Sequence, residues 1–147
     1  IGLRFFSVYG PFGRPDMALF KITKSIYTKK QFEVFNFGKH ERDFTYIDDC
    51  TEYIRNIYRK PSKNKIPYQI FNIASSSPKK LKYFINLIEN ETKLKLKSKF
   101  IPKQKGDVEK THASTQTIKK VIGKIKITDI AKGIKSFVEW YKSYYKI

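Results

Sequence analysis

The pattern of apolar and polar positions along the chain predicts strands that alternate with helices. Residues 1–8 and 68–74 are almost continuously apolar, which is typical of parallel strands buried on both faces. Residues 32–38 and 93–100 alternate apolar and polar side chains, so each is predicted to be a strand with one solvated face. Lysines line that face in residues 93–100, which indicates a protected sheet edge.

Helical spacing of apolar residues is found between these strands. The predicted helices span residues 17–28, 47–59, 78–91, 115–122 and 128–145. Asp16, Ser77 and Thr128 are expected to begin the first, third and fifth helices as N-terminal caps, and Gly123 to close the fourth. Because strands and helices alternate, we expect an α/β fold.

Apolar stripes indicate which face each helix buries. In residues 17–28 turn spacing places Phe20, Lys24 and Tyr27 on one side. The other stripes are expected at Ile47, Cys50, Ile54, Ile57 and Tyr58; at Leu81, Phe84, Ile85 and Ile88; and at Ile130, Ile134, Phe137, Val138 and Tyr141. Asp48 and Asp49 fall in a first helical turn, where the helix dipole favours each carboxylate by about 0.3–1 kcal/mol. We interpret Cys50 as a core residue.

Length and composition describe one globular unit. The chain has 147 residues, of which 40% are apolar, and it contains no apolar run of the roughly 20 residues that span a bilayer. A single cysteine forms no internal disulfide and fits a reducing compartment, so we expect a cytoplasmic protein. The chain opens on apolar strand residues without an initiating Met, from which we expect the C-terminal part of a longer protein. Such a piece should expose apolar surface where a neighbouring half is missing.

The net charge of +18 raises the alternative of a stand-alone basic module that binds nucleic acid. Only five of the 31 basic residues are arginines, the side chain that sequence-reading sites prefer for bidentate contacts. The lysines are spread over every segment and fall on the predicted polar faces. We therefore expect solvated surface lysines, no nucleic-acid partner and no membrane partner.

The residues alone offer little catalytic machinery. The chain contains no G-x-G-x-x-G, no phosphate-binding P-loop and no nucleophile elbow, and His40, His112 and Cys50 lack metal-ligand spacing. Polar residues do occur in loops at the predicted strand ends, where open α/β sheets bind ligands. They are Ser7, Arg14, Asn36, Arg42, Gln104 and Asp107. The two arginines suggest an anion, although an arginine in a loop also commonly binds backbone carbonyls.

Five ordered blocks resemble the C-terminal half of NAD-dependent nucleotide-sugar epimerases and dehydratases of the extended short-chain dehydrogenase/reductase group. They are GLRFFSVYGPFGRPDMA (2–18), RDFTYIDD (42–49), YQIFNIASSSP (68–78), QKGDV (104–108) and GIKSFVEWYKSYY (133–145). The GRPDMA loop is most similar to UDP-glucuronate 4-epimerases. The resemblance implies the last parallel strands of a Rossmann-type sheet plus a small UDP-sugar-binding α/β domain over residues 1–147, with the NAD-binding half absent.

The resemblance also implies roles for individual residues. Ser7 is similar to the residue that reaches the sugar, Arg14 to a loop arginine near sugar and diphosphate, and Arg42 to the arginine that binds the diphosphate. Residues Val34, Phe35 and Asn36 are expected along the uracil, and Gln104 and Asp107 at ribose and phosphate. Tyr9, Gly10 and Pro11 match the loop near the nicotinamide. Gly13 and Pro15 would stiffen Arg14 as a preorganised anion clamp.

The implied reaction interconverts UDP-glucuronate and UDP-galacturonate through a 4-keto intermediate, with NAD as cofactor. No tyrosine here has a lysine four residues later in the matching context, so the family's Tyr-x-x-x-Lys pair is missing, and with it any catalytic residue. The chain alone is expected to be inactive, and the complete enzyme to be a homodimer. Within the family, a 4,6-dehydratase and a UDP-glucuronate decarboxylase remain alternatives, which product analysis distinguishes.

Overall fold

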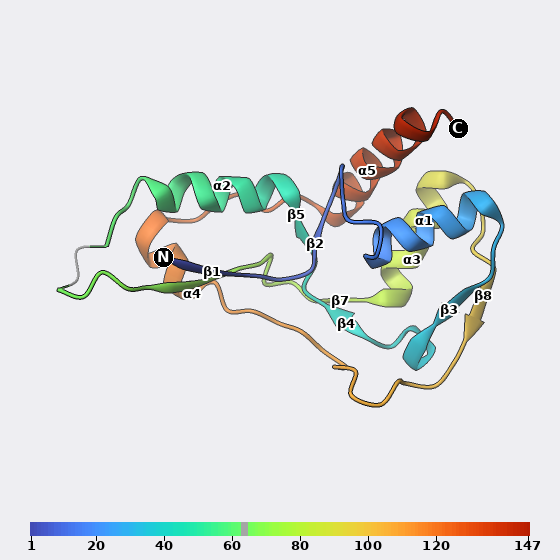
Figure 1. The fold of residues 1–147 in the computed structure, drawn as a ribbon, viewed down its shortest axis with the longest axis horizontal. Helices are drawn as coiled ribbons and strands as arrows, with labels where there is room; N and C mark the ends of the chain where they lie inside the picture. Colours follow the sequence, from blue (N-terminus) through green and yellow to red (C-terminus); the bar gives the residue numbers. More distant parts are fainter. Residues whose placement is uncertain (63–64) are drawn as a thin grey trace.

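The computed structural model describes residues 1–62 and 65–147, and Figure 1 shows an elongated arrangement with two packed ends. At one end, strands β1 (Gly2–Phe5) and β6 (Ile70–Ile73) lie against helices α2 (Ile47–Tyr58) and α4 (Gln116–Ile122). The other end holds helices α1 (Ala18–Thr28), α3 (Leu81–Thr92) and α5 (Ile130–Tyr145). The predicted alternation of strands and helices is confirmed.

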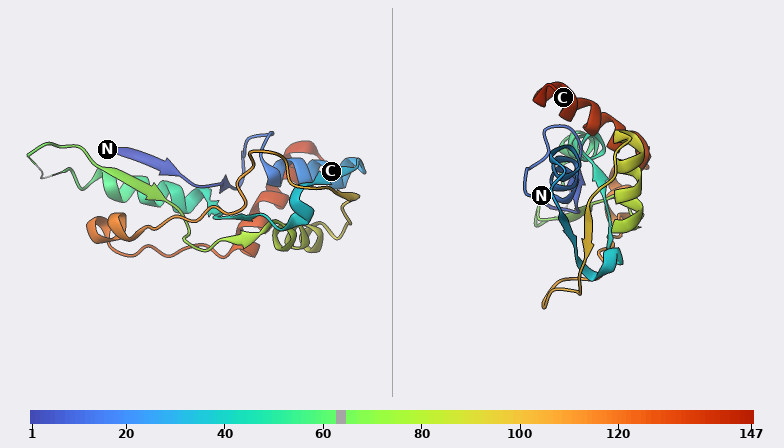
Figure 2. Two further views of the ribbon diagram at one scale, coloured as in Figure 1. Left: turned by 90° about the horizontal axis from the view of Figure 1, so that it is seen from below. Right: turned by 90° about the vertical axis from the view of Figure 1, so that its right-hand side faces the viewer.

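Parallel pairing dominates the sheets. Strand β1 pairs with β6 in parallel, from Gly2 opposite Ile70 to Phe5 opposite Ile73. Parallel pairs also join β2 (Val8–Tyr9) to β5 (Thr45–Tyr46), and β3 (Phe32–Val34) to β8 (Ser98–Phe100). The short strands β4 (Glu41–Arg42) and β7 (Lys79–Lys80) pair antiparallel. Figure 2 shows β3 and β8 running side by side beneath the helices.

Each end has its own hydrophobic core. The core beside β1 and β6 is built on Cys50, Tyr53, Ile57, Phe71, Ile73 and Ile118. The larger core between the three long helices includes Tyr9, Phe20, Ile22, Val34, Phe44, Phe84, Ile88, Ile134, Phe137 and Tyr141. In the larger core the rings of Phe44 and Phe84 stack with centroids 4.0 Å apart.

The predicted strand over residues 1–8 is divided in two. Ser7 has φ 33°, a left-handed conformation that strands do not adopt, so β1 ends at Phe5 and β2 begins at Val8. Thr45 holds this bend, because its hydroxyl donates to the Phe6 carbonyl (2.7 Å) and its backbone N–H to the Ser7 carbonyl (3.2 Å). The bend directs the chain from one sheet into another.

Other strand and stripe predictions were too long or misplaced. Residues 35–38 form the turn η1 (Phe35–Gly38) and not a strand, because Asn36 and Phe37 have a positive φ that strands do not adopt. Only Ser98–Phe100 of residues 93–100 forms a strand. The stripes of α1 and α2 were partly wrong. Lys24, Ile54 and Tyr58 are exposed, whereas Ile22 and Tyr53 are fully buried. The stripes of α3 and α5 are confirmed.

The three predicted N-terminal caps were wrong. Met17 precedes α1 without a side-chain cap, because Asp16 instead binds Arg14. Helix α3 begins at Leu81 after Lys80, since residues 79–80 are used as strand β7. Asp129, not Thr128, caps α5, accepting from Ala131 N–H at 2.9 Å. Gly123 closes α4 as predicted.

Gly133 allows α5 to approach β2 and β5 closely. A Cβ at this position would lie 2.5 Å from the Tyr9 hydroxyl and 2.8 Å from Tyr46 Cδ2. Both contacts are shorter than van der Waals packing allows, so only glycine fits without a shift. The close approach sets Tyr9 against Phe44, Tyr46 and Phe84, next to the pocket described below.

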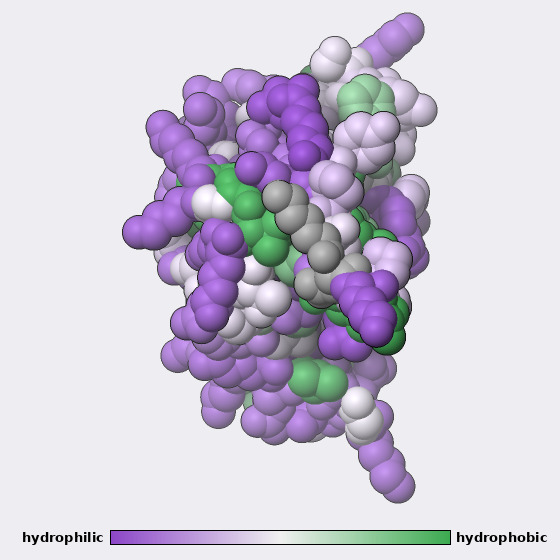
Figure 3. Space-filling view, turned by 90° about the vertical axis from the view of Figure 1, so that its left-hand side faces the viewer, coloured by the Kyte–Doolittle hydropathy of each residue, from purple (hydrophilic) through white to green (hydrophobic). Residues whose placement is uncertain are grey.

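Apolar residues are exposed at the end that carries β1 and β6. Ile1, Phe5 and Ile70 are exposed by 52%, 49% and 37% of their surfaces. Figure 3, which looks onto this end of the molecule, shows hydrophobic residues between hydrophilic ones. None of the helices in the described part of the chain combines the length and the hydropathy that a membrane-spanning segment needs.

Candidate functional site

A pocket of about 730 Å³ opens at the larger end of the molecule. One side is formed by residues of β2 and of the loop that leads into α1, and another by β3, η1 and β4. Its apolar lining includes Phe35, Phe44, Phe84 and Phe137, and its cations are Arg14, Lys21 and Arg42. The pocket can therefore hold an anionic group beside a flat or apolar one.

Arg42 is the best-anchored cation of the pocket. Its Nη1 donates to the carbonyls of Glu41 (3.0 Å) and Glu109 (3.2 Å), and its Nη2 donates to Asp107 Oδ1 (3.1 Å). The side chain is 22% exposed. These bonds fix the plane of the guanidinium and use three of its five N–H groups, leaving two for a ligand.

Asp107 lies between two basic side chains at this polar end. Its Oδ1 accepts from Arg42, while its Oδ2 lies 3.2 Å from Nε2 of His40, which is 4% exposed. Within the described residues, His40 Nε2 is nevertheless without an aligned hydrogen-bond partner. Sequence reasoning placed Asp107 here but left out His40, which is separated from Arg42 by only one residue.

Arg14 lies at the solvent-exposed rim of the pocket and is already paired. Its Nη2 and Nε donate to the two carboxylate oxygens of Asp16 at 2.6 and 3.1 Å, and 76% of its side chain is exposed. The hydrogen bonds from Arg14 hold the pKa of Asp16 below its ordinary value. Asp16 thus competes with any anion for this arginine, a feature that the expected rigid clamp did not include.

Two further residues of the same segment line the pocket. Ser7, in its left-handed conformation, lies at the bend between β1 and β2. Tyr9 contributes from the core side, because its ring is 6% exposed. Burial, and after it the charge of Asp49, raises the pKa of the Tyr9 phenol well above its ordinary value. The hydroxyl of Tyr9 therefore stays protonated.

Of the remaining predicted site residues, two line the pocket and four do not. Gly10 and Phe35 line the pocket, whereas Pro11, Val34, Asn36 and Gln104 are not part of its lining. Val34 is fully buried in the larger core, and its carbonyl accepts from Ile101 N–H. Gln104 is exposed on the loop before Asp107. The roles expected for these residues remain predictions.

Two carboxylates of the RDFTYIDD block have structural partners that sequence reasoning missed. Asp43 is fully buried and accepts from the Ser75 hydroxyl (2.7 Å) and Ala113 N–H (3.1 Å). Asp49 is 4% exposed and accepts from the hydroxyl (2.7 Å) and N–H (2.9 Å) of Thr128. Both carboxylates join segments far apart in sequence, whereas Asp48 is exposed as expected at a helix start.

Cys50 is confirmed as a core residue. It is 2% exposed, and burial, with the charge of Asp49 second, raises the pKa of its thiol to about 12. The thiol is therefore protonated and poorly nucleophilic at neutral pH. In the described part of the chain, His, Cys, Asp and Glu form no cluster of three that could hold a metal ion.

The fold and sequence are similar to those of known proteins. Protein CapI of Staphylococcus aureus is 42% identical over 159 residues, which are 99% of this chain and 48% of that protein. UDP-glucuronate 4-epimerase 1 of Arabidopsis thaliana is 38% identical over 158 residues, covering 98% of this chain and 37% of that protein. The chain thus spans less than half the length of these relatives.

Among solved structures, UDP-glucuronic acid 4-epimerase from Bacillus cereus, in complex with UDP-glucuronic acid and NAD, superposes with a TM-score of 0.87. It is 26% identical, and the match covers 97% of this chain and 45% of that one. This likeness confirms the predicted Rossmann-type epimerase fold. The model of the NAD dependent epimerase/dehydratase family matches residues 1–74. The chain belongs to the NAD-dependent epimerase/dehydratase family.

Proposed function

We propose that this chain is the substrate-binding part of an NAD-dependent nucleotide-sugar 4-epimerase, and that its pocket holds UDP-glucuronate for interconversion with UDP-galacturonate. The observation that carries the proposal is the anchored guanidinium of Arg42, which offers two remaining N–H groups at the polar end of the pocket. Named UDP-glucuronate 4-epimerases are similar to nearly the whole chain, which supports the choice of sugar nucleotide.

Arg42 would bind the diphosphate, because a planar guanidinium whose orientation is fixed matches phosphate oxygens well. The other groups of the pocket would bind the remaining parts of the same ligand. Phe35 offers an aromatic surface to the uracil, and Asp107 can accept from a ribose hydroxyl. Ser7 would donate to the sugar from the bend between β1 and β2.

Arg14 would take part only after exchanging its partner. A carboxylate or phosphate at the rim must compete with Asp16, whose two oxygens both accept from the guanidinium. The pair is exposed to water, so that exchange costs little free energy. We propose that Arg14 closes onto the anionic sugar by leaving Asp16.

NAD, when bound, supplies the acceptor and donor of the hydride that the epimerisation of C4 requires. The residues of this chain would contact only one edge of that cofactor. The Tyr9 ring is buried, and the space a Cβ would take at Gly10 is filled by Ile47 at 2.5 Å. Tyr9 and Gly10 would therefore meet the nicotinamide through their backbone, beside the ring of Pro11.

We further propose that a dinucleotide-binding domain accounts for the remaining length seen in the relatives. It would extend the sheet of β1 and β6 and cover the apolar residues exposed at that end, Ile1, Phe5 and Ile70. A cytoplasmic location and a homodimeric enzyme belong to the same proposal. The single buried thiol of Cys50 is compatible with a reducing compartment.

The test is product analysis with the full-length protein, NAD⁺ and UDP-glucuronate. The proposal expects UDP-galacturonate to accumulate to equilibrium without release of CO₂ and without loss of water. Formation of a pentose nucleotide would show a decarboxylase, and a 4-keto-6-deoxy product from UDP-glucose, offered as a second substrate, would show a dehydratase. No turnover and no protection of the protein by UDP-glucuronate in a thermal unfolding assay would refute the proposal.

A further inference from the structure

The imidazole of His40 is the least satisfied polar group beside the pocket. His40 is 4% exposed and lines the pocket, and in the described residues its Nε2 has no aligned hydrogen-bond partner. Most buried polar groups in proteins are paired, and an unpaired one destabilises the folded state. A carboxylate oxygen, Asp107 Oδ2, lies only 3.2 Å from it, so a small rotation can complete the bond.

Asp107 is also the side chain that holds Nη2 of Arg42. A diphosphate that binds the two remaining N–H groups of Arg42 shares the charge of the guanidinium and so weakens its bond to Asp107. A carboxylate that is 31% exposed and whose arginine bond is weakened is stabilised by another donor nearby. Nε2–H of His40 is that donor, because it already faces the other oxygen of the same carboxylate.

The backbone makes His40 the fixed member of this pair. The His40 carbonyl accepts from Leu81 N–H at 2.8 Å, and β4, paired with β7, follows directly. Asp107 instead lies on the loop between Ile101 and Thr111, where residues 102–106 are exposed. When the carboxylate shifts toward the imidazole, the loop that carries Asp107 moves and His40 keeps its position.

Resting on the proposed binding of UDP-glucuronate at Arg42, we propose that His40 is a positioning residue of that site. Its Nε2–H donates to Asp107 when the diphosphate draws on the charge of Arg42, so that the carboxylate keeps a full partner while the guanidinium stays oriented for the ligand. His40 acts through Asp107 and touches neither the sugar nor the cofactor.

The test measures UDP affinity of the full-length protein by calorimetry. His40→Leu removes the donor and should raise the Kd for UDP about tenfold, whereas His40→Gln keeps an N–H near the Nε2 position and should restore most of the affinity. His112→Leu is the matched control, because His112 is exposed and lies outside the pocket lining. In an Asp107→Asn background, His40→Leu should have no further effect.

A spectroscopic measurement on unaltered His40 makes the test independent of how the variants fold. The Nε2–H resonance of His40 should move downfield when UDP is added to the wild-type protein, and should not move in Asp107→Asn. Equal Kd values for the Leu variant and the wild type, additive effects in the double variant, or an unmoved resonance on saturation with UDP would overturn the inference. Unchanged UDP affinity on loss of Arg42 would instead refute the proposed function.

Discussion

Arg14 and Arg42 differ in how firmly each guanidinium is held before a ligand binds. Arg42 is held by two carbonyls and a carboxylate in a half-buried position, whereas Arg14 is paired with an exposed aspartate. The first is oriented before any ligand arrives. The second must be released from its partner, and its contribution to affinity is reduced by that competition.

Replacing Asp16 should therefore strengthen binding. In Asp16→Asn the guanidinium of Arg14 loses its charged competitor, and we expect the Kd for UDP-glucuronate to fall about twofold or more. Asp48→Asn, which removes an exposed carboxylate outside the pocket lining, is the control for net charge. Weaker binding in Asp16→Asn would contradict the role proposed for this pair.

The same pair has a defined pH dependence. Arg14 lowers the pKa of Asp16, so any stabilisation by the pair is complete above the ordinary aspartate pKa and is lost as the pH falls through the lowered value. In Arg14→Gln the pKa of the Asp16 carboxyl, followed by NMR, should rise towards its ordinary value of 3.8. An unchanged pKa would show that the pair does not form in solution.

At the scale of single residues, the sequence predicted the pocket better than it predicted the partners. Ser7, Arg14, Arg42 and Asp107 were named from loop position and family resemblance, and all line one pocket. Asp16 was predicted to cap the first helix, because an aspartate before a helix is a normal cap, whereas it pairs with Arg14. Contacts such as the approach of His40 Nε2 to Asp107 Oδ2 join residues distant in sequence, and no local pattern reveals them.

Helices α2 and α5 are joined through their first residues. Asp49, in the first turn of α2, binds the hydroxyl and N–H of Thr128, which lies just before the cap of α5. This link connects the smaller core to the larger one. Sequence reasoning assigned both residues to their own helices, because capping is the usual role of such side chains.

Loss of this link should destabilise the protein. Asp49→Ala leaves the half-buried N–H of Thr128 without its partner, and we expect the free energy of unfolding to fall by about 1–3 kcal/mol in a denaturant titration. Asp48→Ala, the exposed neighbour in the same turn, should change it by less than about 0.5 kcal/mol. Equal losses in the two variants would mean that the helix dipole, not the link, is what matters.

The burial of Cys50 on α2 predicts that its thiol reacts slowly in the native protein. With its pKa raised to about 12, Cys50 should react with a maleimide at pH 8 far more slowly in the native protein than in denaturant. Mass spectrometry of the peptide that contains Cys50 follows the reaction. Rapid native labelling would show that the interface of α2 with β6 and α4 opens frequently.

Helices were predicted more accurately than strands. Their apolar periodicity persists over several turns, so α2, α4 and α5 ended within a residue or so of the expected positions. Strands of two to four residues give too short a pattern, and their ends depend on backbone conformations such as Ser7 and Asn36 and on distant pairing. No local sequence rule predicts these backbone conformations or the distant strand pairing.

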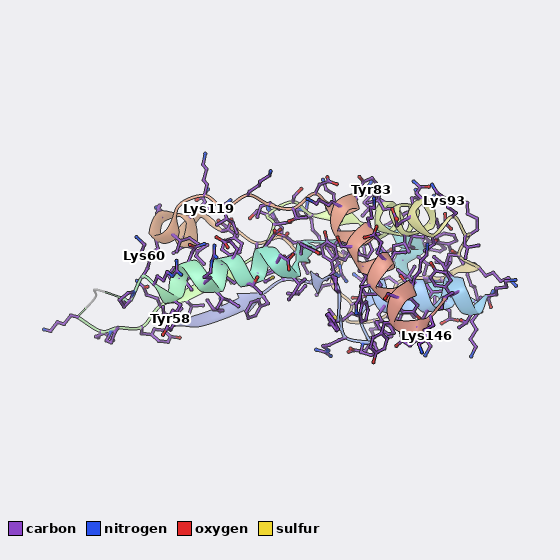
Figure 4. All side chains as sticks on the ribbon, turned by 90° about the horizontal axis from the view of Figure 1, so that it is seen from above. Tyr58, Lys60, Tyr83, Lys93, Lys119 and Lys146 are labelled. Carbon is purple, nitrogen blue, oxygen red and sulfur yellow. The ribbon has the colours of Figure 1, made fainter. Side chains whose placement is uncertain are left out.

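At the scale of the whole molecule, the pocket and the exposed apolar residues lie at opposite ends. The pocket lies in the larger core, while the apolar residues of β1 and β6 are exposed at the other end, where we propose a second domain. Figure 4 places the labelled Lys60 and Lys119 at one end and Lys93 and Lys146 at the other. The lysines of the described residues are exposed or half-buried, which confirms the expectation of surface lysines. The absence of a nucleic-acid partner remains a prediction.

The binding of UDP itself tests the central claim most directly. Calorimetry on the full-length protein should give a Kd for UDP that rises about 30-fold in Arg42→Gln, because a charged hydrogen bond to the diphosphate is lost. Arg55→Gln, an exposed arginine paired with Glu52 on α2, should leave the Kd unchanged. Equal affinity of the wild type and Arg42→Gln for UDP would contradict the assignment of Arg42 to the diphosphate.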